Sequence, residues 1–211
     1  MNRIRHTRRG CLLIGIALIA TLGLASTASA GKLPKIGKDG VIKANKSIGG
    51  VKLDMTETKV FKKWGKGSCT ASPAVGTTPA QDGCTWSKSK SGGAFEGEYA
   101  HVTFLGTGGG ATATFISISA QRRASDGKLL PGKLSKWKTP KGLHLGSPTA
   151  KIAKEFPAAK PNTGEAVNGF DLVAGASPNV RFTRFTGGSG ASADRLSTVS
   201  LQWDVCHVVD C

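Results

Sequence analysis

Cysteine is the residue type with the most specific chemistry in this sequence. Of the five cysteines, Cys11 lies in the N-terminal leader described below, which leaves Cys69, Cys84, Cys206 and Cys211. In an exported chain an even number of cysteines indicates disulfide bonds, and four cysteines allow three pairings. We predict Cys69–Cys84 and Cys206–Cys211, because both are local and each closes a loop without a regular pattern. A zinc site is the alternative, but zinc favours spacings such as C-x₂-C, which neither pair has.

The other residues that could catalyse a reaction form no recognisable motif. His101, His144 and His207 are far apart in the sequence, and no G-x-S-x-G or H-E-x-x-H pattern is present. Glu96 and Glu98 would share one side of an extended segment, where we expect a solvated strand face. We therefore predict no catalytic residue, no cofactor and no metal ion. A small secreted hydrolase is kept only as the third alternative.

Positive charge is the other strong signal, with a formal net charge of +16. Lysines cluster at 32–66 and 128–141, in the segments GKLPKIGKDGVIKANK, KVFKKWGK and GKLLPGKLSKWKTPK. Trp64 and Trp137 lie within these clusters. Basic groups beside aromatic residues can bind polyanions. An exported protein meets anionic envelope polymers rather than nucleic acid, so no nucleic acid is expected. Solubility through like charge is the alternative role. The candidate binding residues are Lys62, Lys63, Lys66, Lys133, Lys136, Trp137 and Lys138.

The first thirty residues have the pattern of a secretory signal peptide. Arginines precede an apolar run, CLLIGIALIATLGLA, and Ala28-Ser29-Ala30 forms a small-x-small cleavage site. The run is shorter than the ~20 residues needed to span a bilayer, so we expect cleavage rather than a retained anchor. The mature protein would then be extracellular or associated with the cell envelope, without a membrane span. The export route stays open.

One phrase occurs twice in the chain, as GVKLDMTETKVFKKWG at 50–65 and GLHLGSPTAKIAKEFP at 142–157. Each copy begins with alternating apolar residues, which is the two-residue period of a short extended segment. Each then offers a helix start, with Thr56 as the N-cap in the first copy. In the second copy Ser147 would be the N-cap, and Pro148 the first helical residue.

The apolar spacing within each copy predicts a short helix of about three turns with one buried face. Val60 and Trp64 are four residues apart in the first copy, as are Ile152 and Phe156 in the second. Residues at this spacing lie on the same helix face. Trp64 is therefore expected in the core, and the lysines on the opposite face.

Strand patterns follow each predicted helix. The segments CTWSK, EYAHVTFL and ATATFISISAQ follow the first, and FDLVA, NVRFTRFT and LSTVSLQW follow the second. Apolar and polar residues alternate in them, as in antiparallel strands with one wet face; a slip between Phe182 and Phe185 suggests a β-bulge. The glycine-rich segments at 106–110 and 187–194 fit hairpin turns rather than phosphate loops, since no helix follows them.

These patterns predict an α+β fold with two tandem modules, each a short helical unit followed by an antiparallel β-meander. A single β-sandwich with a chance likeness between its halves is the alternative. The predicted organisation is a signal peptide (1–30), a flexible basic arm (31–45), module one (46–123), a connector (124–138), module two (139–205) and a disulfide-closed tail (206–211).

The repeated phrase, with the C-x-W strand at Cys84-Thr85-Trp86, resembles the secreted β-lactamase inhibitor proteins and the related SmpA/OmlA envelope lipoproteins. GVKLDMT at 50–56 and GLHLGSP at 142–148 carry the resemblance, which covers roughly residues 47–204. It implies a tandem-module fold that presents a sheet surface to a protein partner. The sequence departs from the family in having no acid in the GTGGG loop and no cysteine in the body of the second module.

The expected function is that of a non-enzymatic exported binding protein, which presents a sheet surface and hairpin loops to a protein partner in an inhibitor-like manner. The first alternative is an envelope-associated protein that binds polyanions through its lysine clusters. The identity of the partner is not specified by the sequence.

Overall fold

The computed structural model describes residues 32–34, 41–76, 79–87, 97–123, 125–162, 169–175, 180–188 and 193–203. The predicted signal peptide and the predicted Cys206–Cys211 disulfide lie outside these residues. Among the helices that are described, none has the length and apolar content needed to cross a membrane.

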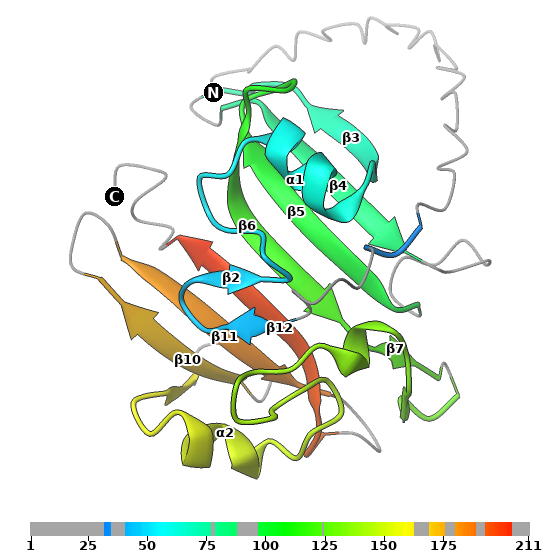
Figure 1. Ribbon diagram of the computed structural model, residues 1–211, viewed down its shortest axis with the longest axis vertical. Helices are drawn as coiled ribbons and strands as arrows, with labels where there is room; N and C mark the ends of the chain where they lie inside the picture. The colour runs from blue at the N-terminus through cyan, green and yellow to red at the C-terminus, as the bar shows by residue number, and fades with distance from the viewer. Residues whose placement is uncertain are drawn as a thin grey trace, which may run out of the picture.

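One antiparallel sheet of eight strands dominates the structure (Figure 1), in the order β3-β4-β5-β6-β12-β11-β10-β9. Strands β6 and β12 pair from Ser119 with Thr198 to Phe115 with Gln202, which joins the two halves of the chain into one sheet. The strands are β3 Ser68–Ser72, β4 Gln81–Ser87, β5 Tyr99–Leu105, β6 Thr112–Ser119, β9 Lys160–Asn162, β10 Gly169–Ala174, β11 Arg181–Gly187 and β12 Leu196–Trp203.

This architecture shows that the predicted α+β fold class is wrong. The protein is mostly β, with 48% of the structure in strands and 12% in helices, and its described part contains two α-helices. The strands form one continuous sheet, not a separate meander after each helical unit. The physical reason is that β6 and β12 would each expose unpaired backbone groups at a sheet edge, and pairing with each other satisfies both edges.

Short elements cover one face of this sheet and enclose the core. In Figure 1 the helix α1 and the β1–β2 hairpin lie in front of the strands, and α2 lies at the lower end of β10 and β11. Apolar residues alternate toward this side: in β5, for example, Ala100, Val102 and Phe104 are fully buried. The covering elements are α1 Glu57–Trp64, α2 Ala150–Glu155, the 3₁₀ helix η1 Leu134–Lys136, β1 Ile42–Lys43, β2 Ser47–Ile48, β7 Gln121–Arg122 and β8 Leu129–Leu130.

Helix α1 follows the predicted pattern in its buried face but not in its cap. Val60 and Trp64 are buried, as predicted. Thr56 occupies the N-cap position, but its side chain makes no capping hydrogen bond. The Glu57 backbone N–H donates instead to the carbonyl of Ala111, which satisfies one of the free donors at the start of the helix.

Helix α2 is shorter than predicted, because it begins two residues after Pro148 and has Thr149 at its N-cap. Ser147 does not cap the helix; its hydroxyl accepts the backbone N–H of His144. Ile152 is buried as predicted. Phe156 follows the helix as its C-cap residue and stacks on Phe185 of β11 at 5.1 Å between ring centroids.

No β-bulge separates Phe182 from Phe185. Strands β11 and β12 pair without interruption from Arg181 to Thr186. Because successive strand residues point to opposite faces, Phe185 faces the core and Phe182 faces the other side of the sheet. The apparent slip in the sequence therefore marks two aromatic residues with different surroundings.

A cluster of three tryptophans ties helix α1 to the segment that follows η1. Trp64 makes an edge-on contact with Trp86 of β4 at 5.2 Å and a tilted contact with Trp137 at 5.8 Å between ring centroids. The indole N–H of Trp64 donates to the carbonyl of Gly49, and that of Trp86 to the carbonyl of Gly65. Trp137 is 1% exposed, which places this predicted binding residue in the core.

Candidate functional site

The sheet has a second face that none of the described elements covers. A central row of six side chains crosses six strands of this face. Each residue of the row is paired directly with the next one on the neighbouring strand. The row runs from β4 to β10 through Thr85, His101, Ser117, Ser200, Arg184 and Asp171. This surface is hereafter called the open sheet face.

The open sheet face is hollowed at its centre by a depression of about 460 Å³, which lies over the junction between β6 and β12. The depression therefore exists only because the two halves of the chain share one sheet. It is lined by Thr85, Tyr99, His101, Phe115, Ser117, Arg184, Thr186, Thr198, Ser200 and Gln202.

Histidine 101 is held at one end of the depression by two hydroxyl groups. Its Nδ1 lies 2.9 Å from Thr85 Oγ1, and its Nε2 lies 3.1 Å from Thr103 Oγ1. A threonine hydroxyl can donate or accept, so both ring nitrogens are satisfied in the neutral imidazole. Burial lowers the pKa of His101, because desolvation disfavours the charged form. His101 therefore contributes a neutral, hydrogen-bonded ring to this surface.

Arginine 184 marks the other end of the depression and is fixed by Asp171. The guanidinium donates from Nε to Asp171 Oδ1 at 2.9 Å and from Nη2 to Oδ2 at 3.2 Å. The Asn162 side chain also donates to Asp171 Oδ2. The guanidinium carbon lies 5.3 Å from the ring centroid of Phe182. These contacts hold the arginine in one orientation and pair its charge within the protein.

Apolar side chains flank this polar row along one side. Phe115 of β6 and Phe182 of β11 both neighbour Gln202 of β12, and Val173 of β10 neighbours Phe182. Val173 is 59% exposed, which is uncommon for a large aliphatic side chain on a sheet. The open sheet face thus combines aromatic rings with serine and threonine hydroxyls around a paired arginine.

This arrangement lacks the partners that a hydrolytic site needs. His101 contacts hydroxyls, and among the described residues no carboxylate hydrogen-bonds to its ring. A general base of the Ser-His-Asp type would need such an orienting group. A second depression of about 570 Å³ lies beside β9 and β10, where the ionisable residue is Asp194. Asp194 pairs with Arg195 at 3.7 Å and is exposed.

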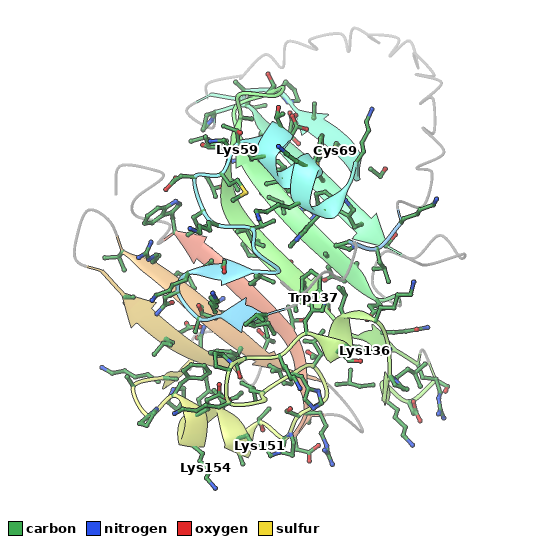
Figure 2. The ribbon with its side chains drawn as sticks, in the orientation of Figure 1. Lys59, Cys69, Lys136, Trp137, Lys151 and Lys154 are labelled. Atoms are coloured by element: carbon green, nitrogen blue, oxygen red, sulfur yellow. A yellow bond between two sulfur atoms is a disulfide. The ribbon has the colours of Figure 1, made fainter. Side chains whose placement is uncertain are left out.

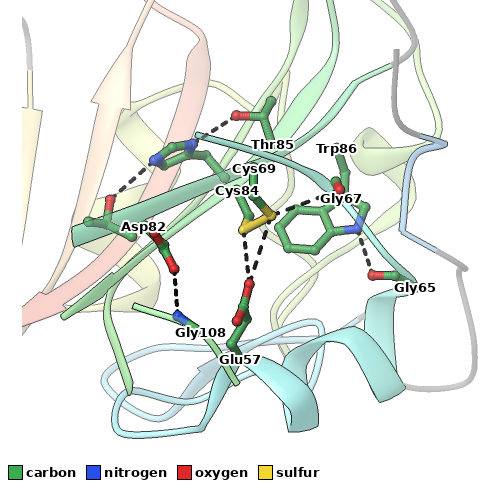
Figure 3. The surroundings of a disulfide bond; sticks show 11 residues. Glu57, Gly65, Gly67, Cys69, Asp82, Cys84, Thr85, Trp86 and Gly108 are labelled. Carbon is green, nitrogen blue, oxygen red and sulfur yellow. Dashed lines mark hydrogen bonds between the residues drawn. A yellow bond between two sulfur atoms is a disulfide. The ribbon is translucent and has the colours of Figure 1, made fainter. Parts of the chain in front are cut away.

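The predicted Cys69–Cys84 disulfide is confirmed, with the two residues directly opposite each other on β3 and β4. Glu57 lies beneath the two sulfurs (Figure 3), with its Oε1 3.8 Å from Cys84 Sγ and 4.0 Å from Cys69 Sγ. These three residues are the closest approach to a metal-ligand set in the described part of the chain. Because the sulfurs are bonded to each other, neither is available as a thiolate ligand.

Burial raises the pKa of Glu57, and the nearby carboxylate of Asp82 raises it further. The ammonium group of Lys66 acts in the opposite direction. A disulfide sulfur carries no hydrogen, so a hydrogen bond between Glu57 and the disulfide requires a protonated carboxyl group as the donor. The site is a buried acid against a disulfide and is structural in character.

The predicted binding lysines are exposed and lie on the side of the protein that carries the helices. Lys62 and Lys63 belong to α1, and Lys66 follows it. Lys133 and Lys138 flank η1, and Lys136 is its last residue. The contact between the Trp64 and Trp137 rings brings these two segments together, although they are distant in the sequence.

Sequence reasoning missed the residues of the open sheet face, including Tyr99, His101 and Phe115. The alternation in EYAHVTFL placed His101 on the face away from the core, which is where it lies. No local pattern indicates that β5 and β6 share this face with β11 and β12, because that depends on the pairing of β6 with β12.

In comparisons with known proteins, the chain matches no family model, no curated protein and no solved structure.

Proposed function

We propose that this protein is a non-enzymatic, exported binding protein whose open sheet face contacts a protein partner. The observation that carries the proposal is the depression across β5, β6, β12 and β11, lined by aromatic and hydroxyl side chains. The export part of the proposal comes from the leader pattern in residues 1–30.

The composition of the open sheet face supports a protein as the ligand. Tyrosine, phenylalanine and arginine are enriched at protein interfaces and supply most of the binding energy there. Serine and threonine hydroxyls add adaptable hydrogen bonds at low conformational cost. Tyr99, Phe115 and Arg184 provide the first group, while Thr186 and Thr198 are examples of the second.

The charge on this face supports a neutral rather than an anionic partner surface. Asp171 pairs the charge of Arg184, and His101 has a lowered pKa. The strands β3–β6 and β10–β12 contain no lysine, and the lysine of the sheet is Lys160 on the edge strand β9, opposite Asp171. A partner would therefore be recognised by shape, apolar contact and hydrogen bonds, without a strong dependence on salt.

Affinity capture of extracellular and envelope proteins with purified protein tests this proposal. Phe115→Ala removes the aromatic ring at the centre of the face, and Lys59→Ala on the opposite side is the matched control. We expect wild type and Lys59→Ala to retain one defined protein that Phe115→Ala loses, by roughly tenfold or more in affinity for a hot-spot ring. Equal capture by all three proteins would refute the role of this face.

The resemblance to secreted β-lactamase inhibitors supplies one class of partner to test directly. A panel of purified β-lactamases, assayed for inhibition and for binding, distinguishes this class from others. The absence of an acid in residues 106–110 leads us to expect binding without strong inhibition. Inhibition that survives Phe115→Ala would show that the enzyme is contacted elsewhere.

A further inference from the structure

Most described lysines of this protein lie outside its eight-stranded sheet, and the exception is Lys160 on the edge strand β9. Every described lysine is exposed, and none of them forms a salt bridge with a described carboxylate. Arginines behave differently, since Arg123, Arg184 and Arg195 all pair with acids. Figure 2 shows labelled lysines on α1, η1 and α2, which are elements of the covered side. The charge of the described lysines is therefore not neutralised by salt bridges to described carboxylates.

Two lysine clusters on that side are joined by the contact between Trp64 and Trp137. Trp64 has lysines two residues before and two after it, and lysines flank Trp137 on both sides. Both rings are buried and their centroids lie 5.8 Å apart, so the two lysine-bearing segments meet at this contact. We treat the exposed lysines of the two segments as one basic surface. We define it by Lys62, Lys63, Lys66, Lys133, Lys136 and Lys138.

The chemistry of this basic surface favours a flexible polyanion over a membrane. Membrane-surface binding combines basic residues with apolar ones that enter the headgroup region. The exposed large apolar residues of the described chain are Val75 and Val173, and neither neighbours the basic surface in sequence. Lysine is also a compact point charge on a flexible stem, which suits diffuse contacts with successive anionic groups better than the fixed bidentate geometry of arginine.

We propose that the basic surface around Trp64 and Trp137 binds a linear phosphate polymer, independently of the open sheet face. The six lysines come from two short segments of the chain, Lys62 to Lys66 and Lys133 to Lys138, which allows several phosphates of one polymer to be contacted together. Because the two faces lie on opposite sides of the sheet, the protein can hold an anionic polymer while the open sheet face stays accessible to a protein.

Titration with long-chain inorganic polyphosphate tests this proposal. Binding is measured at about 50 mM and about 200 mM salt, a range over which electrostatic binding of a polyanion falls steeply. We expect binding at the lower salt concentration, with a log–log salt slope of about −0.7 for each lysine that contacts the polymer. Orthophosphate, which contacts one or two lysines, is expected to bind far more weakly. No binding of polyphosphate at the lower salt concentration would overturn the proposal.

Charge-matched variants locate the site. Replacing Lys62, Lys63, Lys136 and Lys138 by glutamine is expected to weaken polyphosphate binding by at least tenfold. The control replaces Lys128, Lys151, Lys154 and Lys160 by glutamine, which removes the same charge elsewhere, and is expected to weaken binding less than threefold. An equal loss in the two variants would mean that net charge alone attracts the polymer, and would overturn the proposed site.

Two further experiments test whether binding depends on charge alone and whether the ligand is a polymer or a membrane. Replacing the same four lysines of the basic surface by arginine keeps the charge and is expected to retain binding to within about threefold. Vesicles of anionic lipid are expected to bind more weakly than polyphosphate at equal phosphate concentration. Tighter binding to the vesicles than to polyphosphate would contradict the proposal and would indicate a membrane surface as the ligand. Phe115→Ala is expected to leave polyphosphate binding unchanged. The proposal for the basic surface and the proposal for the open sheet face can therefore be refuted separately.

Discussion

Glu57 Oε1 lies 3.8 Å from the Sγ atom of Cys84, which places a carboxyl group directly against the disulfide that joins β3 to β4. Glu57 is only 9% exposed, and Asp82 lies close enough to raise its pKa further. The first residue of α1 is thus held in a position where its ionised form is disfavoured. The helix, the disulfide and the hairpin turn that contacts Asp82 meet at this point.

Glu57→Gln is expected to stabilise the protein at neutral pH but not in acid. A raised pKa in the folded state means that the unfolded state ionises first as the pH rises. The wild type therefore loses stability as the pH increases above the ordinary pKa of a glutamate, because Glu57 has a raised pKa in the folded state, while the glutamine variant does not. Thermal unfolding should show a higher Tm for the variant than for the wild type at pH 7. The difference should vanish near pH 4; a lower Tm at pH 7 would contradict this reading.

Removal of the disulfide by Cys69→Ser with Cys84→Ser is expected to lower the free energy of unfolding by about 3 kcal/mol, given the separation of 15 residues. Strand β3 is an edge strand with mostly exposed side chains, so the cross-link and the backbone pairing with β4 hold it to the sheet. Urea unfolding measures the loss. Wild type under reducing conditions should reproduce it, and a loss below about 1 kcal/mol would show that β3 is held by other contacts.

Glu98→Gln is expected to destabilise the protein by about 1–3 kcal/mol. The buried Glu98 carboxylate accepts the backbone N–H groups of Lys133 and Leu134, one on each oxygen. Glutamine offers a single carbonyl oxygen, so one N–H at the start of η1 would face an NH₂ group. Asp126→Asn, on an exposed hairpin, is the control and should change stability by less than about 0.5 kcal/mol in chemical denaturation. Equal stability of the two variants would contradict the role of Glu98.

Two glycines with positive φ allow a steric test of the tryptophan cluster. Gly49 has a φ of 56°, and a Cβ atom there would overlap the ring of Trp137. Gly65 has a φ of 84°, but a Cβ atom there would meet no atom within 4 Å. We expect Gly49→Ala to cost at least about 3 kcal/mol and Gly65→Ala about 1–2 kcal/mol, which is backbone strain alone. Similar losses in urea unfolding would contradict the packing of Trp137 on Gly49.

Local features of this protein could be predicted from the sequence where buried apolar residues recur at the period of a helix or a strand. The spacing of Val60 and Trp64 identified the buried face of α1, and alternation identified the central strands. The Cys69–Cys84 pairing followed from proximity in the sequence. Strand β3 was missed because most of its side chains are exposed, so its sequence shows no apolar alternation.

Long-range pairing could not be predicted. The pairing of β6 with β12 places Phe115 opposite Gln202. The residues next to each of them in the sequence do not indicate this pairing. That pairing overturned the predicted fold class and also created the open sheet face. The buried roles of Glu98 and Trp137 were missed for the same reason. Glu98 lies in the core because it binds η1, and Trp137 because it packs against Trp64 and Gly49.

Site-specific photo-crosslinking tests the central claim most directly, which is that the open sheet face binds a protein. A crosslinking amino acid at Phe115 probes the depression, and one at Lys59 probes the opposite side of the sheet. In the presence of extracellular and envelope proteins, we expect a discrete adduct of one protein from position 115 and none from position 59. An adduct from position 59 alone, or none from either position, would contradict the account.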